Sequence, residues 1–351
     1  MAAAPSSLLA IAEGVETRLR EVIDAESARW TALDPALAAP FDSLSGLVFQ
    51  GGKRLRPAFC RWGWVAAGGC GPDDAVVNAG AAIELLHAFA LFHDDVMDGS
   101  ATRRGVRTTH LDFADRHQVN DWRGEARRFG EGVAILVGDL AFVYADQLLH
   151  DAPPAAWRLW NELRVELNIG QYLDILGTAN GDRRAASAQR ISRYKSGKYT
   201  VERPLHLGAA IAAPDRPELL EELSAYGLPL GDAFQLRDDM LGVFALEDQI
   251  GKPVGDDLRE GKPTPLLAYA CEVANAAQRC VLDRVGRPDL TVDEVASIQQ
   301  VLVDTGAVAE IESRIETLAA QAVQALDVTD IEDEARKELT ELAHFVAWRA
   351  R

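Results

Sequence analysis

The chain has 351 residues, of which 48% are apolar and 26% are charged. A chain of this length and composition can bury a large core, which argues against intrinsic disorder. Its 54 acidic and 36 basic side chains give a formal net charge of −18. This charge disfavours a nucleic acid as partner for the surface as a whole. Any anion that the protein binds therefore needs a local basic site.

The cysteine pattern and the N-terminal sequence predict a reduced, cytoplasmic protein. The four cysteines form no C-x-x-C pair, and MAAAPSSLLAIAEG has no positive stretch ahead of its apolar residues. Apolar runs such as LGAAIAAP at 207–214 are much shorter than the roughly 18 residues that a membrane span requires. We therefore expect no membrane span.

Apolar residues recur at intervals of three and four through most of the chain, which predicts helices. The polar segment 112–132 is expected to be a loop, and Asn180-Gly181 a turn between two helices. No repeat and no linker breaks the pattern, so we expect one all-α domain over residues 1–351. The predicted helices cover 6–29, 74–98, 131–150, 155–178, 216–246, 291–304 and 309–327.

The segment LFHDDVMDGSATRRG, residues 91–105, places three carboxylates at the end of an apolar helix. Asp94 and Asp98 are four residues apart and share a helix face, while Asp95 lies about a quarter-turn aside. Such crowded like charges repel each other unless a cation lies between them. Two arginines, Arg103 and Arg104, begin five residues after Asp98.

A basic segment, GGKRLRP at 51–57, places Lys53, Arg54 and Arg56 behind two glycines. A glycine backbone can approach a ligand closely and expose its amide donors. The alternative is a solvated basic surface. The segment RYKSGKYT at 193–200 is open to a simpler reading, because lysines beside a glycine are also typical of a helix C-terminus.

A second pair of carboxylates lies in FQLRDDMLGVF, residues 234–244. Asp238 and Asp239 are surrounded by apolar residues, and Gln235 precedes Asp238 by three positions. An exposed acidic edge is the alternative to a functional site. The glycine-rich segment GKPVGDDLREGKPTPLL at 251–267 then supplies Lys252 and Lys262.

A diphosphate bound through Mg²⁺ accounts for this alternation of acidic and basic clusters. Mg²⁺ takes one or two carboxylates together with phosphate oxygens, while Lys and Arg bind the remaining phosphate charge. The spacing of His87, His93 and His110 does not match a transition-metal site. No Walker-type phosphate loop is present in the sequence.

Five motifs together resemble the trans-type polyprenyl diphosphate synthases, which include farnesyl and geranylgeranyl diphosphate synthases. They are GGKRLRP, HDDVMDGSATRRG, YKSGKY, GDAFQLRDD and GKPVGDDLREGKPTPLL, in that order, and they span most of the chain. The resemblance implies an isoprenoid-synthase-like helical bundle around a deep central cavity. It also implies a homodimer, with the two aspartate motifs facing each other across the cavity mouth.

The resemblance also implies a role for each matching residue. The implied ligands of three Mg²⁺ ions are Asp94, Asp95, Asp98, Asp238 and Asp239. The implied catalytic residues are Asp94, Asp98, Asp238, Lys195 and Gln235. The allylic diphosphate would be bound by Arg103, Lys195 and Lys252, and isopentenyl diphosphate by Lys53, Arg56, His87 and Arg104. Further substrate-binding residues would be Gln171, Asp174, Ser196 and Lys262.

Helix geometry supports one of these assignments. His87 lies seven residues before Asp94, which places both within about 20° on one helix face. A core histidine bonded to a backbone carbonyl is the alternative.

The implied reaction joins isopentenyl diphosphate to an allylic diphosphate and makes a longer trans-prenyl diphosphate. A bulky Phe89 followed by the small Ala90 resembles the pattern of a twenty-carbon, geranylgeranyl synthase. The alternative for Phe89 is an ordinary core aromatic residue.

Gly242 stands where many relatives have the last aspartate of the second motif, and its effect stays open. The preferred allylic starter is also open. Other interpretations are a farnesyl or longer-chain synthase, a class I terpene cyclase, and a non-catalytic synthase subunit.

Overall fold

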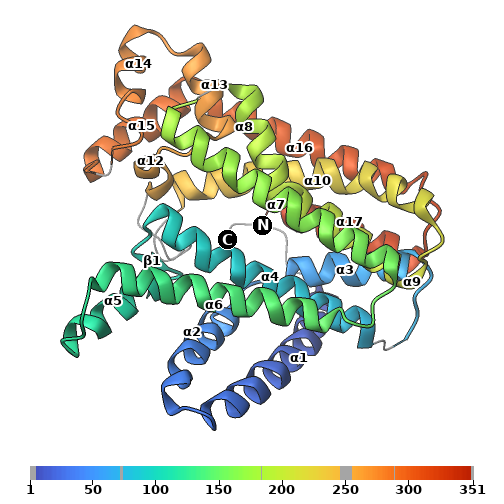
Figure 1. Ribbon diagram of the computed structural model, residues 1–351. Helices are drawn as coiled ribbons and strands as arrows, with labels where there is room; N and C mark the ends of the chain where they lie inside the picture. The colour runs from blue at the N-terminus through green and yellow to red at the C-terminus, as the bar shows by residue number, and fades with distance from the viewer. Residues whose placement is uncertain (1–4, 72–73, 183, 246–254, 288, 349–351) are drawn as a thin grey trace. The chain divides into compact units, whose positions relative to one another are not determined.

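The computed structural model describes residues 5–71, 74–182, 184–245, 255–287 and 289–348. Within these ranges the chain is helical almost throughout (Figure 1). Two short strands are the exception in the described part, β1 (Thr102–Arg103) and β2 (Val106–Arg107), which pair antiparallel. The prediction of an all-α protein is confirmed.

The contacts within the chain group it into two compact units. We define the N-terminal unit as Ser6–Arg61 and Cys70–Pro153. The C-terminal unit comprises Met1–Pro5, Trp62–Gly69 and Pro154–Arg351. That both units form one domain stays a prediction.

The N-terminal unit is built around α4 (Asp74–Asp98), which packs along α6 (Ala126–Leu148) (Figure 1). By length and composition α4 could cross a membrane, but 61% of its most apolar stretch is buried inside the protein, as in the core helix of a soluble protein. The remaining helices here are α1 (Ser6–Thr31), η1 (Pro35–Leu37), α2 (Ala38–Phe49), the start of α3 (Leu55–Ala66) and α5 (Thr109–Val119).

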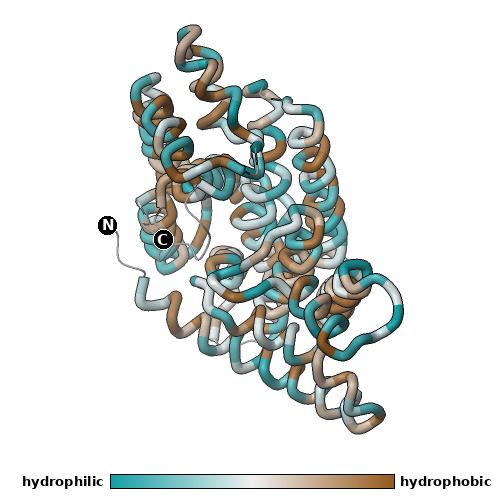
Figure 2. The backbone as a smooth tube through the Cα atoms, turned by 90° about the vertical axis from the view of Figure 1, so that its left-hand side faces the viewer, coloured by the Kyte–Doolittle hydropathy of each residue, from teal (hydrophilic) through white to brown (hydrophobic). Residues whose placement is uncertain are grey.

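The C-terminal unit has α10 (Pro217–Phe244) at its centre, packed against α16 (Ala307–Leu326) and η2 (Arg193–Glu202). Hydrophobic and hydrophilic residues alternate along the helices in Figure 2. Such alternation is expected of helices that bury one face and expose the other. The other elements are α7 (Pro154–Asn180), α8 (Ala185–Ser192), α9 (Arg203–Ala212), α12 (Asp256–Glu260), α13 (Pro265–Val273), α14 (Ala276–Leu282), α15 (Val292–Asp304) and α17 (Asp333–Trp348).

The predicted loop over 112–132 is wrong for most of its length. Helix α5 continues to Val119, and α6 already begins at Ala126. Phe113 and His117 lie four residues apart on the buried face of α5, and both rings contact Phe129 of α6. A few apolar and aromatic residues at helical spacing are therefore enough to bury one face of a mostly polar helix.

The expected turn at Asn180-Gly181 is confirmed. Helix α7 ends at Asn180, and Gly181 has a φ of +65°. This left-handed conformation favours glycine and commonly ends a helix.

The segment RYKSGKYT does not end a helix, because it continues as the π-helix η2. Its backbone packs very closely on both neighbours. A Cβ added at Gly170 of α7 would lie 2.7 Å from the Cα of Lys195, and one at Gly231 of α10 would lie 2.5 Å from the carbonyl oxygen of Gly197. The glycines allow this contact, which holds Lys195 and its neighbours in place.

Candidate active site

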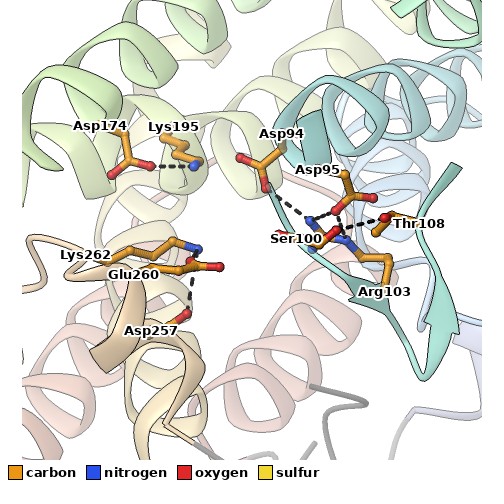
Figure 3. A network of polar contacts seen from close by, with 10 residues as sticks. All are labelled: Asp94, Asp95, Ser100, Arg103, Thr108, Asp174, Lys195, Asp257, Glu260 and Lys262. Carbon is orange, nitrogen blue, oxygen red and sulfur yellow. Dashed lines mark hydrogen bonds and ion pairs between the residues drawn. The ribbon is translucent and has the colours of Figure 1, made fainter. Parts of the chain in front are cut away.

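The first aspartate motif lies on the last turn of α4, where Arg103 of β1 contacts two of its carboxylates (Figure 3). Arg103 donates from Nη2 to Asp94 Oδ2 at 3.2 Å. It donates to Asp95 Oδ1 from Nε at 2.9 Å and from Nη2 at 2.5 Å. Arg103 thus places a positive charge beside two of the crowded carboxylates, a contact that the sequence analysis did not predict. Asp98, the last residue of α4, is partly buried.

A tight hairpin positions Arg103. Arg103 pairs with Val106, and the two residues between them, Arg104 and Gly105, have φ values of +52° and +77°. Two left-handed residues in succession are typical of a two-residue turn that matches the twist of paired strands. Thr108 Oγ1 donates to the carbonyl oxygen of Ser100 at 2.8 Å and fixes the base of the hairpin (Figure 3).

The carboxylates also determine the ionisation of Arg103. Burial lowers its pKa, but the negative charges of Asp95 and Asp94 and the hydrogen bonds to them outweigh burial and raise the pKa above its ordinary value. Asp95 and Arg103 line a cavity of about 610 Å³ within the N-terminal unit, together with Arg20, Phe49 and Arg116.

The basic loop before α3 is anchored by Arg54. This side chain is buried, has a φ of +50°, and pairs with Glu84 and, at 3.1 Å, with Glu16. It also donates to the carbonyl oxygen of Val48 at 2.7 Å. Arg54 therefore holds the loop in shape. The sequence analysis did not predict a role for Glu84. A single acidic residue in the apolar run AAIELLHAF could have indicated a buried ion pair.

The predicted residues of the metal-free diphosphate site come together in the N-terminal unit. Arg104 Nη1 donates to the carbonyl oxygen of Gly51 at 2.7 Å, which joins the hairpin to the glycine loop. Lys53 is partly buried on that loop. The pKa of His87 lies well below its ordinary value because of burial and then the positive charges of Arg56, Arg104, Arg103 and Arg54. His87 is therefore neutral and surrounded by cations at neutral pH.

In the C-terminal unit, η2 and α7 bring two predicted site residues into contact. Lys195 Nζ donates to Asp174 Oδ2 at 2.6 Å (Figure 3). Asp174 is buried, while Gln171 and Ser196 are partly buried on α7 and η2. Lys195 is thus held by a carboxylate in this structure.

The second aspartate motif lies on α10. Asp238 is partly buried and Asp239 is buried, and Gln235 Nε2 donates to Asp239 Oδ1 at 2.6 Å. Burial raises the pKa of Asp239 to about 8; the hydrogen bond from Gln235 opposes this shift, and the negative charges of Asp257 and Asp238 add to it. A cation bound beside Asp239 would favour its charged form and oppose this shift.

Lys262 lies beside acidic residues rather than alone on a basic loop. Its Nζ is 2.6 Å from Glu260 Oε2 and 3.6 Å from Asp257 Oδ1 (Figure 3). Lys252, the other predicted lysine of this segment, lies outside the described residues.

The predicted chain-length residues lie on α4. The ring of Phe89 contacts His93 at a centroid distance of 4.5 Å and Phe142 of α6 at 4.9 Å. Ala90 is partly buried. Phe89 is therefore packed between aromatic side chains, and the role of both positions in product length stays a prediction.

The donor set fits Mg²⁺ in part. Among the described residues, no group of three or more His, Cys, Asp or Glu side chains could hold a metal ion by itself. Mg²⁺ commonly uses only one or two carboxylates and takes its other ligands from phosphate and water. The paired carboxylates of each motif fit this chemistry, provided that the diphosphate supplies the other ligands.

A buried ionic network that joins α7, η2 and α9 was not predicted. Glu166 of α7 pairs with Lys198 of η2 and, at 2.6 Å, with Arg203 of α9. Burial raises the pKa of Glu166, but the hydrogen bonds from Arg203 and Lys198 outweigh it, so the pKa lies below its ordinary value. The sequence signal was weak, because these residues read as ordinary charged positions on helices.

Comparison with known proteins identifies the family. The family model described as polyprenyl synthetase matches residues 39–302. The geranylfarnesyl diphosphate synthase of Aeropyrum pernix is 33% identical over 314 residues, which cover 86% of this chain and 92% of that protein. The geranylgeranyl diphosphate synthase of Sulfolobus acidocaldarius is 32% identical over 266 residues, 73% of this chain and 74% of that one.

Solved structures agree with the sequence comparison. A geranylgeranyl pyrophosphate synthase from Corynebacterium glutamicum, complexed with isoprenyl diphosphate and magnesium, is 36% identical, with a TM-score of 0.91. The match covers 97% of this chain and 98% of that one. The chain therefore belongs to the polyprenyl synthetase family.

Proposed function

We propose that the protein is a Mg²⁺-dependent prenyltransferase that condenses isopentenyl diphosphate with an allylic diphosphate, and that geranylgeranyl diphosphate is its main product. Family membership supports the reaction class, since the relatives are named as synthases of prenyl diphosphates. Their names differ in chain length, from farnesyl to nonaprenyl. The proposed length therefore rests on the pattern at Phe89 and Ala90.

The observation that carries the proposal is the arrangement within the N-terminal unit. Arg103 joins the carboxylates of Asp94 and Asp95, while His87 is surrounded by the charges of four arginines. A carboxylate group suits a diphosphate that is bound through metal, and a group rich in arginine suits one that is bound without metal. Two diphosphates with these different needs are the substrates of the proposed reaction.

In the proposed reaction the allylic C–O bond breaks and diphosphate leaves with the electron pair. Its lysine and arginine ligands, which include Lys195 and Arg103, stabilise the charge that develops on it. The alkene carbon of isopentenyl diphosphate forms the new C–C bond to the allylic cation. The departed diphosphate accepts the proton lost from the adduct, which closes the step with one isoprene unit added.

Three further parts complete the proposal. Mg²⁺, when bound, lowers the charge of the leaving diphosphate and helps to fix its orientation. We assign its binding to Asp94, Asp98 and Asp238, with Asp95 and Asp239 in support and three ions per active site. Gln171, Asp174, Ser196 and Gln235 face the cation and exclude the water that would quench it. Lys53, Arg56 and Arg104 bind isopentenyl diphosphate, and Lys252 and Lys262 assist with the other diphosphate.

The proposal also includes a homodimer that works in the cytoplasm without a membrane span. Light scattering of the purified protein is expected to give twice the mass of one chain. The mass of a single chain would contradict the dimer but leave the reaction untouched.

Turnover assays test the reaction class. Purified protein with Mg²⁺, isopentenyl diphosphate and dimethylallyl, geranyl or farnesyl diphosphate is expected to release diphosphate. Omission of isopentenyl diphosphate should abolish the release. No turnover with any of the three starters would contradict the proposal and favour a non-catalytic subunit. Hydrocarbon or alcohol formed from an allylic diphosphate alone would identify a terpene cyclase instead.

A further inference from the structure

Gly242 leaves a space on α10 that the side chain of Asp257 fills. A Cβ added at Gly242 would lie 2.7 Å from Asp257 Cγ, which is closer than real Cβ atoms approach a neighbour. Any side chain at position 242 must therefore displace the Asp257 carboxylate. The two positions compete for one volume beside the second aspartate motif.

Asp257 is held in this volume by its own segment. It lies in the first turn of α12, which Gly255 opens and Gly261 closes in left-handed conformations. The amides of Gly261 and Lys262 donate to the Asp257 carbonyl oxygen at 3.0 and 3.2 Å. Lys262 Nζ lies 3.6 Å from the Asp257 carboxylate. The backbone contacts fix the position of Asp257 in its segment, and Lys262 contacts its side chain.

The position of Asp257 adds a carboxylate beside the helix that carries the second aspartate motif. Asp238 and Asp239 lie one turn before Gly242 on α10, since residues four apart share a helix face. The Asp257 carboxylate fills the space at Gly242 and therefore lies about one turn along the same helix from that pair. Carboxylates that lie near one another repel, and a bound cation would offset this repulsion.

We propose that Asp257 supplies the carboxylate that position 242 lacks, so that Asp257 acts with Asp238 and Asp239 in binding the metal-diphosphate. This inference rests on the proposed function, because it assigns a further binding residue to that site. Lys262 serves as the partner that keeps Asp257 pointed at the site. The acid that is missing at position 242 is then supplied from fifteen positions later in the chain.

Relocation of the carboxylate tests the inference. The probe is Mg²⁺ with a fixed concentration of inorganic diphosphate, and the readout is the Mg²⁺ concentration that gives half of the maximal rise in melting temperature. Asp257→Asn and Asp257→Ala are each expected to raise this concentration at least tenfold. The double variant Gly242→Asp with Asp257→Ala should return it to within threefold of the parent, because the new acid fills the vacated volume.

Asp330→Asn is the matched control, since its side chain is 98% exposed in the same unit; it should leave the Mg²⁺ midpoint unchanged. The melting temperature without Mg²⁺ shows whether each variant is folded. Two substitutions at Asp257 are used so that the test still holds if one of them fails to fold. Midpoints within threefold of the parent for a folded Asp257 variant, or no rescue in the double variant, would overturn the inference. A parent protein that shows no stabilisation by Mg²⁺ and diphosphate would overturn the proposed function as well.

Discussion

Arg103 and Arg104 are neighbours in the chain, yet the hairpin turn gives them opposite surroundings. Arg103 binds the carboxylates of Asp94 and Asp95, and their charges raise its pKa. Burial, with the charges of nearby arginines, lowers the pKa of Arg104 although Glu84 opposes this shift. Within one hairpin, Arg103 therefore contacts acidic side chains, whereas Arg104 lies near other arginines.

Arg103→Gln is expected to lower turnover about a hundredfold, equivalent to ~2.7 kcal/mol of activation free energy. The variant loses the cation that keeps two carboxylates together and that stabilises the leaving diphosphate. Steady-state rates of diphosphate release measure the effect. Arg127→Gln is the control, because Arg127 is exposed and pairs with Glu131 on α6. A rate for Arg103→Gln within threefold of the parent would remove Arg103 from the site.

Phe89→Ala is expected to let prenyl chains longer than twenty carbons accumulate. The substitution removes a ring that contacts His93 and Phe142, and the neighbours refill such a volume only in part. Chromatography of the dephosphorylated products measures chain length. The control Phe129→Ala removes a ring on α6 that contacts α5 and should not change the product. An unchanged distribution for Phe89→Ala would show that this ring does not limit the chain.

At the scale of elements, the π-helix η2 depends on glycines that let backbones touch. Gly170→Ala would place a Cβ 2.7 Å from the Lys195 Cα, so we expect a loss of about 2–3 kcal/mol in unfolding free energy. Gly132→Ala on α6 has no neighbour within 4 Å and should add about 0.5–1 kcal/mol, because alanine suits a helix better. Urea denaturation of both variants gives the comparison. Equal stability in the two would contradict close packing at η2.

The contact between α9 and α10 predicts a dependence of stability on pH. His206 is buried, and burial followed by the charge of Arg203 lowers its pKa to about 3. The folded protein therefore binds this proton less readily than the unfolded chain, whose histidine titrates near 6.5. The neutral His206 therefore contributes its full stabilisation of the folded protein above pH 6.5, and this stabilisation is lost as the pH falls toward 3.

His206→Gln should flatten this dependence by up to about 1.4 kcal/mol per pH unit, the value for one proton. Unfolding free energies measured from pH 7 to pH 4 give both slopes. The variant also changes hydrogen bonds with Ser224 and Arg203, which shifts stability at every pH alike. Parallel curves of unfolding free energy against pH for parent and variant would therefore contradict the prediction that His206 is neutral when buried.

For the whole molecule, periodicity predicted the long helices well, because each carries one apolar face along its length. It failed for α5, where Phe113 and His117 bury a helix whose other residues are mostly polar. The predicted ranges also left out other helices, including α2, α3, α9 and α17. It also gave no sign of the two compact units, since their contacts join segments that are distant in sequence.

The candidate site was predicted by residue type and motif, whereas its pairings needed the fold. The sequence indicated a cation for Asp94 and Asp95, but it did not show that Arg103 supplies it. Arg54 read as one of three basic loop residues, although burial beside Glu84 makes it an anchor. Gly242 read as a missing acid, because only the folded chain brings Asp257 against it.

Incorporation of labelled isopentenyl diphosphate tests the central claim most directly. The protein is incubated with Mg²⁺, an unlabelled allylic diphosphate and isotope-labelled isopentenyl diphosphate, and the products are analysed by mass spectrometry. We predict a main prenyl diphosphate of twenty carbons whose label increases by one unit for each five carbons added to the starter. Products that carry no label, or an allylic substrate that stays unextended, would contradict a chain-elongating prenyltransferase.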